Sequence, residues 1–144
     1  MATTTNYSWD TPDDTDLVKD GALAIRTLAG EIDDTVFDGL TLADINTQTG
    51  TTYTLVLGDA GRTIDIANAS SITLTVPPHS SVAFPTGTRI DLVAAGAGIV
   101  TVAEGSGVTV NSKEDLLKLT GQWSAATLIQ RAEDSWVLIG DLSA

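Results

Sequence analysis

The sequence predicts a mainly β protein, with an N-terminal arm and a single α-helix followed by an all-β sandwich or barrel-like domain. From Gly50 onward, short runs of alternating apolar and polar residues recur at intervals of about 8–12 residues, separated by Gly- and Pro-containing turns. Between residues 16 and 38 the spacing of apolar residues is instead helical. We therefore divide the chain into a polar docking arm (1–15), a helix (16–39), a linker (40–49) and an all-β domain (50–144).

The arm is hydrophilic except for two aromatic residues, Tyr7 and Trp9. Aromatic side chains of this kind anchor protein–protein contacts, so they could enter pockets on a partner. They could equally fold back onto the chain's own helix, and the sequence leaves both explanations open. Acidic residues after Pro12 favour a helix start, because carboxylates cap the first turn and stabilise its positive end.

The predicted helix carries an apolar seam. Val18, Ile25 and Ile32 are seven residues apart, and Leu28 lies between the last two. The seam could pack on the chain's own β-domain or form a small parallel bundle in an oligomer. Ile and Leu in these heptad positions favour two helices over three. The partner-docking residues predicted from the arm and the seam are Tyr7, Trp9, Val18, Ile25, Leu28 and Ile32.

The centre of the β-domain is predicted to contain three short strands between residues 71 and 93. Ile72, Leu74 and Val76 alternate with threonines, the pair Val82 and Phe84 repeats the alternation, and Ile90 with Leu92 repeats it again. Near the end of the chain, 128–130 and 136–139 predict a hairpin. Trp123 and Trp136 could line a groove that binds sugars, but they are expected to fill the core, because they lie among apolar strands. There is no long internal repeat, so a solenoid is not expected.

Composition excludes several functions. The net charge of −12, from 19 acidic and 7 basic residues, argues against nucleic-acid binding. Apolar runs are too short to cross a bilayer, and no secretory signal peptide is expected from the polar start. Because the chain has no cysteine, it can form no disulfide and no cysteine-based metal site.

No catalytic, cofactor-binding or metal-binding residue is predicted. His79 is the only histidine and lies in a Pro-Pro-His-Ser-Ser turn, where adjacent residues rarely reach the geometry of a Ser-His pair. We expect it to be an exposed turn residue. The acidic clusters at 10–20 and 31–34 lack calcium-loop spacing, so helix capping and solvation explain them better than calcium does.

Two parts of the chain resemble structural proteins of tailed bacteriophages. The segment Tyr7–Leu28, YSWDTPDDTDLVKDGALAIRTL, resembles one that recurs in virion proteins of actinobacteriophages. Several further segments resemble a β-domain of tail-fibre-like and other virion surface proteins. They are TTYTLVL (51–57), the turn at 76–78, FPTGT (84–88) and WVLIGD (136–141).

This resemblance implies a homotrimer on the exterior of the virion, made in the host cytoplasm and without enzymatic activity. Two placements are compatible with it. A decoration protein would bind the major capsid protein through the arm and helix. A short tail fibre would bind tail proteins through the same segment and present the β-domain to a host-surface glycan. The chain is short for a fibre and has no shaft repeat, which favours decoration.

Overall fold

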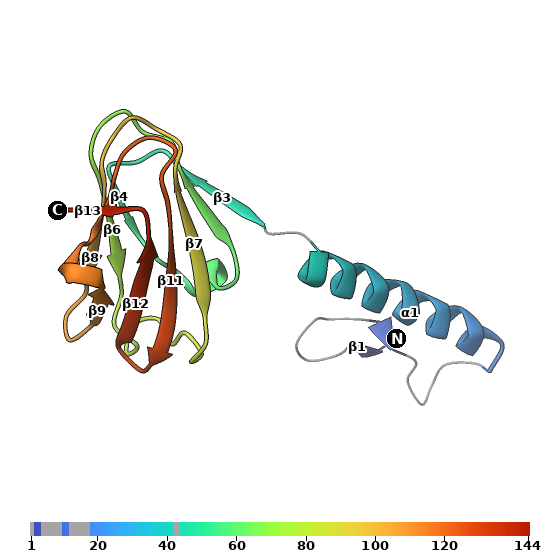
Figure 1. Ribbon diagram of the computed structural model, residues 1–144. Coiled ribbons are helices and arrows are strands. Elements are labelled where there is room, and N and C mark those ends of the chain that lie inside the picture. The colour runs from blue at the N-terminus through green and yellow to red at the C-terminus, as the bar shows by residue number, and fades with distance from the viewer. Residues whose placement is uncertain (1, 4–9, 12–17, 42–43) are drawn as a thin grey trace. The chain divides into compact units, whose positions relative to one another are not determined.

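The computed structural model describes residues 2–3, 10–11, 18–41 and 44–144. The chain divides into two compact units, Met1–Leu42 and Ala43–Ala144. The first unit contains β1 (Ala2–Thr3), β2 (Asp10–Thr11) and α1 (Val18–Thr41), as Figure 1 shows. β1 pairs with β2 in antiparallel fashion, and β2 lies against α1. The helix continues through Gly39, which was the predicted end.

The second unit is mainly β and consists of two sheets that enclose one hydrophobic core. One sheet has the strand order β3-β5-β7-β11-β12-β9, and the other β13-β10-β8-β6-β4. The six-stranded sheet contains β3 (Ile45–Gln48), β5 (Thr63–Ile66), β7 (Arg89–Ala94), β9 (Thr109–Ser112), β11 (Ala125–Ala132) and β12 (Ser135–Gly140). The five-stranded sheet contains β4 (Thr52–Thr54), β6 (Ile72–Val76), β8 (Val100–Glu104), β10 (Lys118–Leu119) and β13 (Leu142–Ser143). Two short 3₁₀ segments, η1 (Leu57–Asp59) and η2 (Lys113–Asp115), complete the unit.

From β3 to β8 the chain winds from one sheet to the other and back, and we call this winding of six strands the coil. Successive strands from β3 to β8 alternate between the sheets, and β3, β5 and β7 pair in parallel in one of them. The strands β4, β6 and β8 pair in parallel in the other. The expectation against a solenoid is therefore wrong for these six strands. The connections differ in length and content, so the winding leaves no periodic signal in the sequence.

Antiparallel strands complete the sheets after the coil. β11 pairs with β7 and forms a hairpin with β12, as predicted for the end of the chain. In the other sheet β10 pairs with β8 and with β13. β9 adds to the outer side of β12 in parallel.

Two of the predicted boundaries differ from the structure. β3 (Ile45–Gln48) lies within the segment that the sequence indicates as a linker. The prediction missed this strand because Asn46 and Gln48 are polar, so the segment lacks alternating apolar residues. The predicted strand around Val82 and Phe84 is a turn segment instead. Pro77, Pro78 and Pro85 flank it, and proline cannot donate to a β-ladder.

The core contains one of the two tryptophans predicted to fill it. Trp136 is 1% exposed, and its ring meets that of Phe84 edge to face, with centroids 5.4 Å apart and an interplanar angle of 90°. Phe84 thus packs in the core although its segment is not a strand. Trp123 is 73% exposed, so the prediction for that residue is wrong.

Candidate functional site

An apolar stripe on α1 is open to solvent in the single chain. Ile25 is 63% exposed and Ile32 37%, while Leu28 is half-buried between them. Val36 lies one turn beyond Ile32 on the same side and is also exposed. With about 100° per residue, these four side chains share one face of the helix. They form what we call the helix stripe: Ile25, Leu28, Ile32 and Val36.

Three of the predicted docking residues cannot be placed in this stripe. Tyr7 and Trp9 lie outside the described residues, as does the side chain of Val18, whose backbone begins the helix. Val36 was not predicted, although its spacing of four from Ile32 is the signal that would have found it. Leu23 is exposed as well, but it lies on the opposite face of the helix.

Four loops stack at one end of the β-unit, the upper end in Figure 1, and we call this end the loop tip. The loops are 49–51, 67–71, 95–99 and 121–124. Gly98 N donates to Asn68 O at 2.9 Å, and Asn68 Nδ2 donates to Thr49 O at 2.7 Å. Trp123 N donates to Ala94 O at 2.6 Å, which fixes the last loop beside the third. The chain enters the unit at the opposite end of β3.

The stacking of these loops requires glycine at two positions. A Cβ on Gly98 would lie 1.8 Å from Ser70 O, and a Cβ on Gly96 would lie 2.1 Å from Asn68 O. Both contacts are with backbone atoms, which cannot rotate away as a side chain can. The loose, flexible turn that glycines and alanines suggest at 94–98 is therefore a tightly packed one.

A buried carboxylate organises the first turn of the coil. Asp59 is 1% exposed and accepts hydrogen bonds from Asn46 Nδ2 at 2.8 Å, Tyr53 Oη at 2.9 Å and Val56 N at 2.8 Å. Gln48 Nε2 in turn donates to Asn46 Oδ1 at 2.7 Å. These side chains come from β3, β4 and η1, so the cluster ties three elements together. The local sequence Gly-Asp-Ala-Gly around Asp59 indicates a turn but no buried role for its carboxylate.

The same cluster affects the phenol of Tyr53. Burial raises the pKa of Tyr53 above its ordinary value of 10.0, and the hydrogen bond to Asp59 raises it further. Both effects favour the neutral phenol, which donates to the carboxylate. The cluster is therefore a satisfied structural network at neutral pH and offers no base or nucleophile poised for chemistry.

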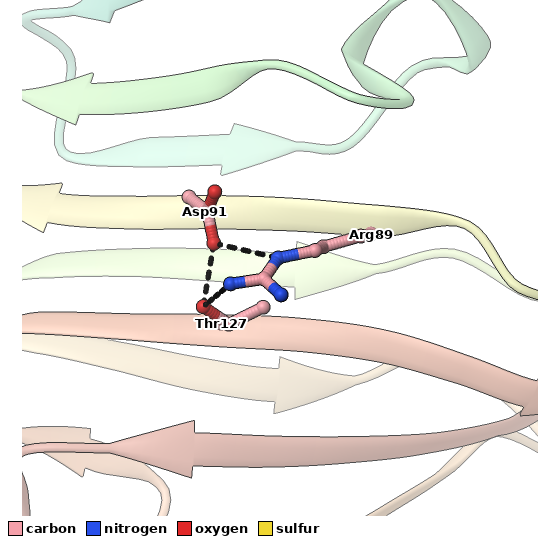
Figure 2. A network of polar contacts seen from close by, with 3 residues as sticks. All are labelled: Arg89, Asp91 and Thr127. Carbon is pink, nitrogen blue, oxygen red and sulfur yellow. Dashed lines mark hydrogen bonds and ion pairs between the residues drawn. The ribbon is translucent and has the colours of Figure 1, made fainter. Parts of the chain in front are cut away.

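A second polar network lies on the outer face of the six-stranded sheet, and Figure 2 shows its three residues. Asp91 on β7 accepts hydrogen bonds from Thr127 Oγ1 on β11 and from Arg89 Nε, the latter at 3.3 Å. Arg89 and Asp91 are both substantially exposed. Exposed pairs of this kind contribute about 0–1 kcal/mol, so the network supports the pairing of β7 with β11 only modestly.

His79 is half-buried, where an exposed residue was expected. Its backbone N donates to Asp134 Oδ1 at 2.6 Å, which ties the proline turn to the β11–β12 hairpin. Its Nδ1 is buried without a hydrogen-bond partner in the described part of the chain. No hydrogen bond joins the imidazole to a serine hydroxyl among the described residues, so the geometry of a Ser-His pair is not formed.

A pocket of about 410 Å³ lies beside η2 and the last two strands. Its charged lining residues are Lys113, Glu114 and Asp141, and Lys113 Nζ is 3.7 Å from Glu114 Oε1. Thr120 Oγ1 donates to Asp141 at 2.8 Å. The three charged side chains of this pocket thus already have polar partners, Lys113 and Glu114 each other and Asp141 the hydroxyl of Thr120.

Within residues 2–3, 10–11, 18–41 and 44–144, no three His, Cys, Asp or Glu side chains are grouped as metal ligands would be. The helix in this part of the chain is not apolar enough over its length to cross a membrane. No protein-family model matches the chain, and no curated protein matches it in sequence.

Proposed function

We propose that this chain is a non-catalytic structural protein of a tailed-bacteriophage particle, a trimeric decoration protein on the outer capsid. The helix stripe holds the trimer together, the arm and the other faces of the helix dock on the major capsid protein, and the β-unit is displayed outside. The mechanism is cementing: each trimer buries arm and helix surface across the boundaries between capsid subunits. Separation of those subunits then requires breaking the added contacts as well.

The observation that carries the proposal is the helix stripe. A helix with Ile25 at 63% and Ile32 at 37% exposed leaves apolar surface in water, and burying it against another chain is favourable. The stripe belongs to Met1–Leu42, a unit with its own internal contacts, and the β-unit has a core of its own. A protein that joins an attachment segment to a displayed domain has this division. The resemblance of residues 7–28 to actinobacteriophage virion proteins is the reason for proposing a phage particle as the structure to which the chain attaches.

Localisation on intact particles tests the proposal directly. Cryo-electron microscopy of particles of the encoding phage, with icosahedral averaging, should reveal many copies of the β-unit on the capsid exterior. Density confined to the tail would contradict decoration. Absence of the chain from purified particles, checked by mass spectrometry, would contradict any role in the virion.

Substitution within the helix stripe should abolish oligomerisation. Replacing Ile25 with aspartate places a charge in the buried seam of a bundle, so sedimentation velocity should show a shift from oligomer to monomer. Leu23→Asp is the matched control, because Leu23 is similarly exposed but faces the opposite side of α1. An oligomer that persists in Ile25→Asp, or that is lost equally in Leu23→Asp, would show that the stripe is not the interface.

One observation favours the second candidate, a short tail fibre whose β-domain binds a host-surface glycan. Trp123 is exposed at the loop tip, at the far end of β3 from the point where the chain enters the β-unit. In a fibre attached through its N-terminal unit, that end of the domain is available to a host surface. Density on the tail in the particle experiment would favour this candidate.

A further inference from the structure

Trp123 combines two features that are unfavourable for the isolated domain. Its side chain is 73% exposed, so the largest apolar side chain among the natural amino acids is left in water. Its backbone φ is +65°, in the left-handed region that bulky residues rarely adopt. Strained residues of this kind persist where surrounding contacts hold them, and they concentrate at binding sites.

The surrounding contacts hold Trp123 firmly. Trp123 N donates to Ala94 O at 2.6 Å, and Ala94 N donates to Ser124 O at 3.0 Å. Ser124 is buried, its N donates to Gly121 O, and its Oγ accepts from Gly121 N at 3.2 Å. The indole is therefore presented on a rigid backbone, which reduces the entropy lost when a ligand binds.

The loops beside Trp123 are small and polar. Gln122 Nε2 donates to Ala95 O at 2.9 Å, which places the amide next to the third loop of the tip. Exposed hydroxyl residues line the first two loops: Thr49, Thr51, Ser70 and Ser71. Ala97 and the glycines leave little side-chain bulk between these hydroxyls and Trp123. The exposed Trp123 therefore has hydroxyl side chains, an amide and backbone carbonyls in the neighbouring loops.

We propose that Trp123 is the stacking platform of a saccharide-binding site at the loop tip, with Gln122 beside it as a hydrogen-bonding group. The apolar C–H face of a pyranose ring would pack on the indole, and its hydroxyls would meet the amide and the loop hydroxyls. This inference rests on the second candidate function, whose glycan-binding site it locates, and it is independent of the decoration proposal because it concerns the β-unit alone.

The surroundings favour a saccharide over other partners. A tryptophan that anchors a protein interface lies within a ring of contacts that excludes water, and a stable interface covers about 800 Å² per partner. Within the four loops only Ile99 adds a second large apolar side chain that is exposed. Nucleic acid is disfavoured by the net charge of −12. A small polyhydroxylated ligand needs only one aromatic face and a few polar groups.

Binding is tested with the full chain on a printed glycan array, followed by tryptophan-fluorescence titration. Maltohexaose, cellohexaose, chitohexaose and oligosaccharides of mannan and galactan are the titration probes. At least one should bind with a Kd of about 1 mM or tighter and change the emission of the exposed indole. Trp123→Ala should weaken that affinity by about tenfold or more on the array and in calorimetry. Ile45→Ala, which truncates a residue 63% exposed at the opposite end of β3, should leave it unchanged.

Either of two results would overturn the proposal. If no saccharide on the array or in the titrations binds the wild-type chain, the loop tip is not a saccharide site. The same holds if Trp123→Ala binds as tightly as wild type. These outcomes are independent of where the chain lies on a particle, so they do not bear on the decoration proposal.

A glycine variant separates binding from folding. Glycine adopts φ = +65° without strain, so Trp123→Gly should raise the melting temperature by a few degrees while it abolishes saccharide binding. A lower melting temperature would mean that the indole stabilises the domain itself, and the argument from strain would fail.

Discussion

Replacing Gly98 with alanine should destabilise the β-unit by about 3 kcal/mol, the upper range for forced overpacking. The new Cβ would lie 1.8 Å from Ser70 O and 2.4 Å from Ser70 C. The two loops cannot separate freely, because Gly98 N donates to Asn68 O at 2.9 Å. The loss is measured by urea denaturation, with the fluorescence of tryptophan and circular dichroism as probes.

Gly58→Ala is the matched control for this prediction. A Cβ on Gly58 meets nothing within 4 Å, and the residue lies in η1 with no left-handed φ. Its effect should stay within about 0.5 kcal/mol, or be slightly stabilising through the lower entropy of the unfolded chain. Equal effects of the two substitutions would show that the stacked loops can separate at little cost. The coil would then depend on its strands alone.

Replacing Asp59 with alanine should also cost about 3 kcal/mol. The substitution leaves three donors without their acceptor: Asn46 Nδ2, Tyr53 Oη and Val56 N. Each buried group left unsatisfied is unfavourable by about 1–3 kcal/mol, and rearrangement or entering water recovers part of the sum. The midpoint of urea denaturation should fall, whereas the slope of the unfolding free energy against urea concentration should change little.

The control for Asp59 is the same substitution at Asp65. Asp65 lies on β5 and is partly exposed, and it accepts a hydrogen bond from Thr47 Oγ1 at the long distance of 3.5 Å. Asp65→Ala should therefore change the free energy of unfolding by no more than about 0.5 kcal/mol. If Asp59→Ala proved as mild as Asp65→Ala, the hydrogen-bonded cluster would not be what holds the first turn of the coil.

Much of the β-unit could be predicted from local patterns. Ile72, Leu74 and Val76 alternate with two threonines, and the structure buries the three apolar residues on one face of β6. Trp136 lies in phase with Leu138, and both are buried in β12. Period-two alternation determines which face of a strand is apolar, and water then determines that this face turns inward.

The error on Trp123 has a local cause. Trp123 follows Gly121 in a turn and has no alternating partner, whereas Trp136 has one. Treating both tryptophans as core residues relied on the apolar strands around them rather than on the place of each residue in an alternating pattern. The exposed indole could have been suspected from this contrast, but its left-handed backbone could not.

Local patterns in the chain are sufficient to predict the division into a helical segment and a β-rich segment, the apolar face of strands such as β6 and β12, and the helix stripe around Ile25 and Ile32. The parallel winding of the strands, the burial of Asp59 among three donors and the meeting of four loops beside Trp123 depend on tertiary contacts. The difference lies in the range of the interactions. Alternation and helical spacing act between neighbours in the chain, whereas strand pairing, Gly98 against Ser70 and Asn46 against Asp59 join residues whose separation no local pattern encodes.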